Sequence, residues 1–234
     1  MKKSEEVFIS EVTYQWAQSH KINSQCFKTI ESTNTLAKKN AFSSNELKNE
    51  VVLYIADQQT AGRGRFDRTW VSGSPGSNLM CTWSFLIDQS TLPETTAKIG
   101  LALINALRST WTFIPFILKA PNDILILQEN GEKKIAGLLV ESIAQADEYR
   151  LIVGLGFNVL KTPEVSTATS LVENLTKKTP LLGEDWIRFL DRFLFELTQV
   201  ISESHIPMTT TEKQNYLSQL NTPYSSFAEI NWDL

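Results

Sequence analysis

Three arginines interspersed with glycines lie in the segment Gly62-Arg63-Gly64-Arg65-Phe66-Asp67-Arg68. Glycine lets the backbone approach a ligand closely, and the planar guanidinium group of arginine suits phosphate and carboxylate oxygens. The third glycine of a dinucleotide-binding motif would fall at Asp67, and no Gly-Lys-Ser/Thr sequence follows, so neither a Rossmann nor a Walker loop is indicated. The segment predicts an anion-binding loop; taken alone, it also fits a solvated charged loop.

A second group of polar side chains occupies the segment Lys119-Ala120-Pro121-Asn122-Asp123. Proline withholds a backbone donor and bends the chain at a strand edge, so the neighbouring side chains can turn toward a common site. A lysine supplies charge for phosphate, and amide and carboxylate oxygens are ligands for Mg²⁺. This combination favours a nucleotide site, and a turn held by the Asn122 and Asp123 side chains is the alternative.

Two glycine-containing segments follow, Lys134-Ile135-Ala136-Gly137 and Gly154-Leu155-Gly156-Phe157-Asn158. Glycine inside a strand often marks the close approach of a ligand or of another backbone. Lys134 is therefore a candidate for contact with a ligand, and a surface lysine beside a hairpin is the alternative. The second segment is a weak signal by itself.

The elements that would position these groups are predicted from hydrophobic periodicity and turn residues. Residues 5–20 carry weak helical periodicity, Ser32 and Thr33 have the side chains of helix caps, and residues 57–77 form a long loop. Residues 79–85 alternate with the period of two that marks a strand. Strands are expected near 26–30, 51–56, 79–85, 116–118, 124–127, 135–140 and 151–159, and helices from Pro93, over 184–202 and after Thr209.

Strands that follow one another through hairpins, with helices between groups of strands, predict an α+β fold. We expect a mixed, largely antiparallel sheet flanked by helices. The chain divides into an N-terminal extension (1–22), a main domain (23–205) and a short C-terminal tail (206–234). A helix-turn-helix module needs more residues than the extension holds.

Composition and charge argue against several classes of protein. The chain of 234 residues has a net charge of -4, which opposes general binding to nucleic acids. Acidic residues follow the first lysines where a signal peptide would have an apolar run, and no stretch approaches membrane-spanning length. The two cysteines and two histidines fit no metal-ligand spacing. We expect a cytoplasmic protein that binds neither DNA nor membranes.

Six motifs, in this order along the chain, resemble the catalytic domain of the biotin–protein ligase family. The resemblance runs from about Phe27 to Asn158 and continues more faintly through the helix that ends near Ser202. Its motifs are Glu31-Ser32-Thr33-Asn34, the Gln59-to-Trp70 loop, Ser77-Asn78-Leu79, Lys119 to Asp123, Lys134 to Gly137, and Gly154 to Asn158. The resemblance implies a fold like that of class II aminoacyl-tRNA synthetases and makes residues 23–205 the catalytic domain.

The resemblance also implies which residues bind each ligand. The biotin site would contain Ser32, Thr33, Asn34, Gln59, Arg63, Gly64, Arg65, Lys134 and Gly137. The ATP site would contain Arg65, Arg68, Trp70, Asn78, Lys119, Asn122 and Asn158. The expected catalytic residues are Lys134, Arg65, Lys119 and Asp123, and the expected metal ligands are Asn158 and Asp123. Asp123 is also our candidate for accepting or orienting the proton of an attacking amine.

The family's activity implies ATP, Mg²⁺ and biotin as the substrate. Biotin is activated as biotinyl-5′-adenylate and then passes to a specific lysine of a biotin carboxyl carrier protein, which belongs to acetyl-CoA carboxylase or another carboxylase. Water would destroy the adenylate, so we expect the arginine loop to close over it. Asp67 is the one acid close to these arginines in the sequence. A homodimer is left open.

The chain departs from the family pattern at three places. Phe66 and Asp67 stand where the loop usually has an arginine-like residue and a glycine, and Ala120 stands where the family has a tryptophan. The third departure is that the chain stops before a complete C-terminal β-barrel, which family members commonly carry. We expect the loop changes to affect loop mobility and Ala120 to remove packing.

Two other functions fit parts of the pattern. A lipoate or octanoate ligase or transferase shares the general fold by resemblance, but members of that class lack the Gly-Arg-Gly-Arg loop. A non-catalytic module that binds biotin or a nucleotide is disfavoured by the presence of Lys134, Arg63 and Arg65. A ligase fused to a transcriptional repressor would need a DNA-binding segment.

Overall fold

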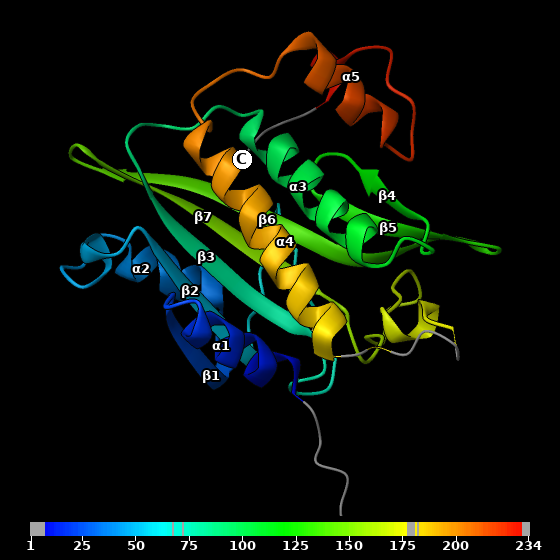
Figure 1. Ribbon diagram of the computed structural model, residues 1–234, viewed down its shortest axis with the longest axis horizontal. Coiled ribbons are helices and arrows are strands. Elements are labelled where there is room, and N and C mark those ends of the chain that lie inside the picture. The colour runs from blue at the N-terminus through cyan, green and yellow to red at the C-terminus, as the bar shows by residue number, and fades with distance from the viewer. Residues whose placement is uncertain (1–7, 67, 72, 177–180, 182, 231–234) are drawn as a thin grey trace, which may run out of the picture.

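A sheet with the strand order β1-β2-β3-β7-β6-β5-β4 forms the centre of the computed structural model (Figure 1). The described residues are 8–66, 68–71, 73–176, 181 and 183–230. The strands are β1 (Asn23–Ile30), β2 (Val51–Gln59), β3 (Leu79–Ile87), β4 (Phe116–Lys119), β5 (Asp123–Gln128), β6 (Gly131–Gln145) and β7 (Glu148–Phe157). In this part of the chain β1 and β2 pair in parallel and the other neighbours are antiparallel. The predicted α+β fold with a largely antiparallel sheet is confirmed.

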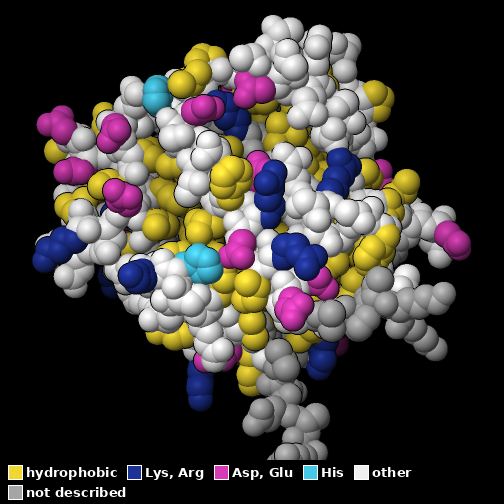
Figure 2. All heavy atoms as spheres, in the orientation of Figure 1, with side chains coloured by type: hydrophobic (Ala, Val, Ile, Leu, Met, Phe, Trp, Pro, Cys, Tyr) yellow, Lys and Arg dark blue, Asp and Glu magenta, His cyan; other side chains and the backbone are white. Residues whose placement is uncertain are grey.

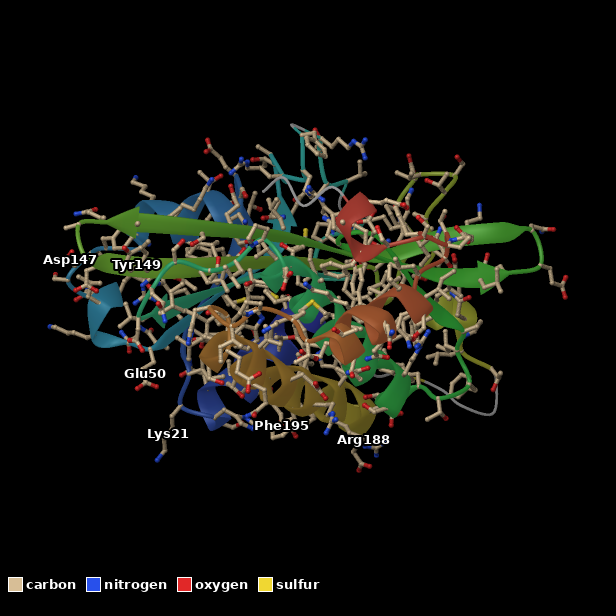
Figure 3. The ribbon with its side chains drawn as sticks, turned by 90° about the horizontal axis from the view of Figure 1, so that it is seen from above. Lys21, Glu50, Asp147, Tyr149, Arg188 and Phe195 are labelled. Carbon is tan, nitrogen blue, oxygen red and sulfur yellow. The ribbon has the colours of Figure 1, made fainter. Side chains whose placement is uncertain are left out.

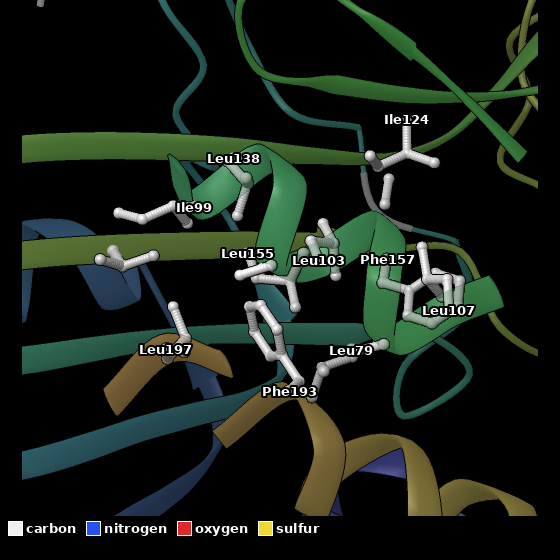
Figure 4. Packing of buried hydrophobic residues seen from close by; sticks show 14 of the residues in the cluster. Leu79, Ile99, Leu103, Leu107, Ile124, Leu138, Leu155, Phe157, Phe193 and Leu197 are labelled. Carbon is white, nitrogen blue, oxygen red and sulfur yellow. The ribbon is translucent and has the colours of Figure 1, made fainter. Parts of the chain in front are cut away.

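Two long helices cover one face of this sheet, which is called the first face below. The helices of the described chain are α1 (Ile9–Ser19), α2 (Thr33–Asn40), α3 (Thr95–Thr110), α4 (Gly183–Ser202) and α5 (Thr210–Ser218), with short 3-10 turns η1 (Glu46–Lys48), η2 (Val172–Asn174) and η3 (Phe227–Glu229). Figures 1 and 3 show α3 and α4 side by side on one side of the sheet. Leu103 of α3 and Phe193 of α4 pack with Leu155 of β7 in the core (Figure 4). Outside this layer, Figure 2 shows positive and negative side chains interspersed, without one dominant charge.

The second face of the sheet is covered in part by α2. Ala37 of this helix is buried against Val52, Tyr54 and Ile152. The helix begins as the sequence indicates, because the Ser32 side chain caps it by accepting a hydrogen bond from the Thr35 amide. α2 also packs against β3 and β7 on this face, and its second residue, Asn34, lies against Gly154 of β7.

The strand predicted from the alternation over residues 79–85 is confirmed as β3, and both of its faces are buried. Met80, Thr82 and Ser84, which alternate with the larger apolar residues, are each at most 1% exposed. β3 lies between β2 and β7 in the middle of the sheet, and α2 packs against its second face. A central strand is buried on both faces, so its polar residues must find partners inside the protein.

Several element boundaries differ from the expectation. The predicted hairpin at Asn130-Gly131 is confirmed, but β6 extends to Gln145, well past the expected end at residue 140. β2 continues to Gln59, and α3 begins at Thr95 and not at Pro93. These ends depend on pairing and packing partners that are distant in sequence, which local periodicity does not report.

The expected extension and tail both pack against the main core. In α1, Trp16 is buried and its Nε1 donates to Asp191 Oδ1 of α4 at 2.7 Å. In the tail, the Gln219 carbonyl accepts from the Leu118 amide of β4 at 2.9 Å, and Tyr216 is fully buried. The three-part division of the chain stays a prediction. None of the described helices has both the length and the apolar character needed to cross a membrane.

A fully buried arginine fixes the segment before β2. Arg150 on β7 is 0% exposed, and its guanidinium donates to the carbonyls of Ser84 at 3.0 Å and Asn49 at 2.8 Å. Its Nη1 also lies 3.9 Å from Glu46 Oε2. The pKa of Glu46 is raised above its usual value because burial outweighs the lowering effects of the Tyr54 hydrogen bond and the Arg150 charge. Arginine can satisfy this many acceptors at once because it carries five donors in one plane.

We predict that Arg150→Met lowers the free energy of unfolding by about 3 kcal/mol or more, because it leaves several buried acceptors without a donor. Urea denaturation measures this change. Arg188→Met is the matched control, since Arg188 pairs with Asp185 at 3.2 Å and its side chain is 60% exposed. The control should shift the stability by less than about 1 kcal/mol. Equal, small shifts in both variants would contradict a central role for Arg150.

Candidate functional site

Three glycines lie together on the second face of the sheet, beside the start of α2. Gly137 on β6 pairs with Gly156 on β7, and Gly154 lies two residues before Gly156 on the same face. A Cβ atom at 154 would overlap the Asn34 side chain, and one at 156 would overlap the Trp70 ring. The absence of side chains therefore lets Asn34 and Trp70 lie directly against the strands.

A cavity of about 150 Å³ opens above these glycines. Most of the residues predicted for the site line it together, although they come from four separate segments of the chain. These are Ser32, Thr33, Asn34, Gln59, Arg63, Gly64, Arg65, Arg68, Trp70, Asn122, Asp123, Lys134 and Gly137. A neighbouring cavity of about 200 Å³ shares Arg63, Gly64, Arg65 and Asn122.

Part of the cavity lining consists of neutral hydrogen-bonding groups. Because β1 and β2 are parallel, Gln59 at the end of β2 lies beside Ile30 at the end of β1, close to Thr33. Gln59 Oε1 accepts from the Thr33 amide at 2.7 Å and lies 3.1 Å from Thr33 Oγ1. The buried Thr82 hydroxyl lies 2.8 Å from Thr33 Oγ1 and 2.7 Å from Asn34 Oδ1. These groups can recognise a polar, uncharged ring.

Arginines reach the same cavity from a small hairpin in the loop after β2. Arg63 and Thr69 form an antiparallel bridge, and the Gly64 amide donates to the Arg68 carbonyl at 2.7 Å. Phe66, between the two bridged residues of this hairpin, has a φ of 54° and is 65% exposed. Asp67 lies outside the described residues. Arg63 Nη1 lies 3.7 Å from Glu141 Oε1, so Asp67 is not the one acid within reach of the loop.

A bulge in β6 directs Lys134 into the cavity. The register between β5 and β6 shifts at this point, and Ile135 and Ala136 both face the core although they are consecutive. Lys134 therefore lies on the same face as Gly137, which regular alternation would not allow. Its Nζ is 2.6 Å from Asp123 Oδ1 and 5.3 Å from the centre of the Trp70 ring. The lysine is held at the mouth of the site by an acid and an aromatic ring.

Three of the predicted site residues do not line either cavity. Asn78 and Asn158 are buried, and the amide of Asn78 donates to Asn158 Oδ1 at 3.4 Å. Asn78 Oδ1 also accepts from the Val159 amide at 2.9 Å, so this pair joins the start of β3 to the end of β7. Lys119 pairs with Asp123 across the β4–β5 ladder, and its side chain is exposed. Their predicted roles toward ATP stay predictions.

The tail lies beside the segment that contains Ala120. This alanine is half-buried against the core, and the Tyr216 hydroxyl of α5 donates to the Pro121 carbonyl at 3.2 Å. Asn122 is held by backbone contact with β6, where its carbonyl accepts from the Leu138 amide at 2.9 Å. The segment is thus positioned from both sides, and Ala120 does not leave it without packing partners.

Sequence reasoning missed Thr82 and Glu141. Both face the cavity side of the sheet from the middle of apolar strands, and both contact Asn34. A polar residue within an apolar strand was the available signal, because such a residue needs a partner when the strand is central. The partner itself is 107 residues away for Glu141 and could not be named from the sequence.

The described residues do not form a metal site from their own side chains. Groups of three or more His, Cys, Asp or Glu suited to a metal ion are absent from the described part. Of the two expected metal ligands, Asp123 lines the cavity and Asn158 does not. Cys81 contributes to the cavity wall, and burial raises the pKa of its thiol to about 12, so it stays protonated near neutral pH.

Comparison with known sequences identifies relatives of the central part of the chain. The model of the biotin/lipoate A/B protein ligase family matches residues 26–158. The bifunctional ligase/repressor BirA of Bacillus subtilis is 38% identical over 120 residues, 49% of this chain and 34% of the relative. The biotin–[acetyl-CoA-carboxylase] ligase of Mycobacterium tuberculosis is 32% identical over 128 residues, 52% of this chain and 45% of the relative. The matches thus span less than half of these two relatives.

Solved structures share the fold over most of the chain. The biotin protein ligase of Aquifex aeolicus, in complex with biotin and ATP, has a TM-score of 0.58 and 30% identity, and the match covers 85% of this chain and 78% of that one. The biotin protein ligase of Leishmania major, in complex with biotinyl-5-AMP, has a TM-score of 0.61 at 22% identity, with 85% and 81% covered. Since the family model also covers more than half of the sequence, the chain belongs to the biotin/lipoate A/B protein ligase family.

Proposed function

We propose that the chain is a biotin–protein ligase that forms biotinyl-5′-adenylate from biotin and ATP and transfers biotin to a lysine of a carrier protein. The observation that carries this proposal is the lining of the cavity. Neutral groups of Thr33, Asn34 and Gln59 line it together with the cationic side chains of Lys134, Arg63 and Arg65. Biotin carries a partner for each kind of group, a cyclic urea and a carboxylate.

The first step requires two anions to approach each other. The carboxylate of biotin is ionised at neutral pH, so no general base is needed before it attacks the α-phosphate of ATP. Arg63, Arg65 and Lys134 would offset the repulsion and stabilise the charge that develops as pyrophosphate leaves. Lys119 lies on the same face as Asp123 and is exposed, which suits contact with the outer phosphates. The adjoining cavity offers space for the second substrate.

The second step requires a neutral amine on the carrier protein. Asp123 is a carboxylate of the cavity wall, and its Oδ1 atom lies 2.6 Å from Lys134 Nζ. We propose that Asp123 orients Lys134 toward the biotin carboxylate and then accepts or orients the proton of the incoming carrier lysine. The carrier would be a biotin carboxyl carrier protein, as for the carboxylase-directed relatives.

Mg²⁺ would enter this site together with the phosphates of ATP. Magnesium in nucleotide sites is usually held by one or two protein carboxylates and by phosphate oxygens, with water completing the shell. Asp123 can supply one such oxygen, and Asn158 is committed to Asn78. The ion would neutralise phosphate charge. We also place the reaction in the cytoplasm, which suits the free thiols of Cys26 and Cys81.

The decisive assay for substrate choice is isotope exchange between ATP and pyrophosphate with biotin or lipoate as the acid. We predict exchange that depends on biotin. Exchange with lipoate should be at least about tenfold slower, because its dithiolane ring cannot satisfy the polar groups of Thr33, Asn34 and Gln59. Labelled biotin should then appear on a carrier protein and not on a carrier whose target lysine is arginine. Faster exchange with lipoate would assign the chain to the lipoate class.

We predict that Lys134→Ala slows adenylate formation by about 10²–10³, because loss of one donor aimed at developing charge has this effect in other enzymes. The neighbouring variant Lys133→Ala is the control, since Lys133 contacts the Ser166 carbonyl and does not line the cavity. Single-turnover formation of the adenylate separates this effect from carrier binding. Activity of Lys134→Ala within threefold of Lys133→Ala would exclude a catalytic role for Lys134.

A further inference from the structure

Glu141 on β6 is contacted by three side chains that are distant from it in sequence. Lys38 Nζ lies 2.7 Å from Oε1, the Asn34 amide donates to Oε2 at 3.0 Å, and Arg63 Nη1 lies 3.7 Å from Oε1. Its side chain is 19% exposed. One carboxylate thus joins α2, which carries Asn34 and Lys38, to the arginine loop.

Glu141 determines which way the Asn34 amide points. A carboxylate accepts hydrogen bonds and donates none, so the Nδ2 group of Asn34 must face Glu141. The Oδ1 atom then faces Thr82, whose hydroxyl lies 2.7 Å away. An amide oxygen also only accepts, so the single hydroxyl proton of Thr82 is committed to Asn34. These three residues are at least 80% buried, so solvent does not compete for the bonds.

The direction of this chain decides what Thr33 offers to a ligand. Its hydroxyl lies 2.8 Å from Thr82 Oγ1 and 3.1 Å from Gln59 Oε1. Because the proton of Thr82 is already used, the hydroxyl proton of Thr33 points to one of these two oxygens. A lone pair of Thr33 Oγ1 is then left for the cavity, which this residue lines. Thr33 is 3% exposed, so an acceptor here requires a donor from the ligand.

We propose that Glu141 is a positioning residue that fixes the direction of the chain Glu141–Asn34–Thr82–Thr33 and thereby selects a ligand ring that donates an N–H group. A cyclic urea has two such donors, and a dithiolane has none. The inference rests on the proposed function and deepens it. It assigns the preference for biotin over lipoate to Glu141, a residue outside the expected biotin site.

The test compares biotin with its two lactam analogues, in each of which one urea N–H is replaced by CH₂, by calorimetric titration. Wild type should bind one analogue about tenfold or more weakly than biotin, as expected when a buried acceptor loses its donor. Glu141→Gln removes the fixed direction, because a glutamine amide can donate or accept. Its biotin affinity should fall about tenfold, and its preference for biotin over that analogue should fall to about threefold or less.

The ratio of biotin affinity to lactam affinity reports on contacts with the ring of the ligand and not on contacts with its carboxylate. Any effect of Glu141→Gln on Arg63 acts equally on biotin and on the lactams, so it cancels in the ratio. Lys38→Met removes a charge from the same carboxylate and leaves Asn34 in place, so this variant should keep the wild-type preference. Thermal unfolding checks that both variants fold.

Two results would overturn the inference and leave the proposed function intact. One is a folded Glu141→Gln variant that keeps the wild-type preference. The other is a wild-type protein that binds both lactams as tightly as biotin, because Thr33 would then not accept from the urea. A wild-type protein that does not bind biotin at all would instead overturn the proposed function, and the inference with it.

Discussion

The site depends on a stretch of sheet surface that carries no side chains. Gly137, Gly154 and Gly156 lie on one face of two paired strands in the middle of the sheet. A larger residue at 154 or 156 would occupy the space that Asn34 or Trp70 now fills, and one at 137 would crowd Lys134 and Asp123. Glycine in a strand weakens the strand, so three of them on one face are tolerated because the opposite face is packed against α3 and α4. One face of the sheet therefore supplies the packing that stabilises the strands, and the other face supplies the glycine surface on which the cavity forms.

The same constraint explains how the charged groups reach the cavity. Lys134 would point into the core if β6 alternated regularly from Gly137, and a buried, unpaired ammonium would be costly. The bulge at Ile135 and Ala136 turns it onto the glycine face, where Asp123 and the Trp70 ring hold it. Arg63 reaches the same face from a hairpin, and its own guanidinium lies 3.7 Å from Glu141 Oε1. The cationic wall is thus built from residues that two different strands and a loop bring together.

Local patterns in the sequence were sufficient for some features and not for others. The Ser32 cap and the Asn130-Gly131 hairpin were predicted correctly, because each depends on a few neighbouring residues. The family motifs also identified most residues of the cavity wall. The parallel pairing of β1 with β2, the bulge before Gly137 and the contacts of Glu141 were not predicted. Each of these depends on register between segments far apart in the chain, and periodicity within one segment does not contain that information.

The central claim is that the glycine face creates the binding site, and titration of biotin into Gly154→Ala tests it most directly. The added Cβ would displace Asn34, so we expect biotin affinity to fall more than about tenfold. Gly183→Ala at the start of α4 meets no atom within 4 Å and should bind biotin as wild type does. A folded Gly154→Ala protein that binds biotin with wild-type affinity would contradict the account.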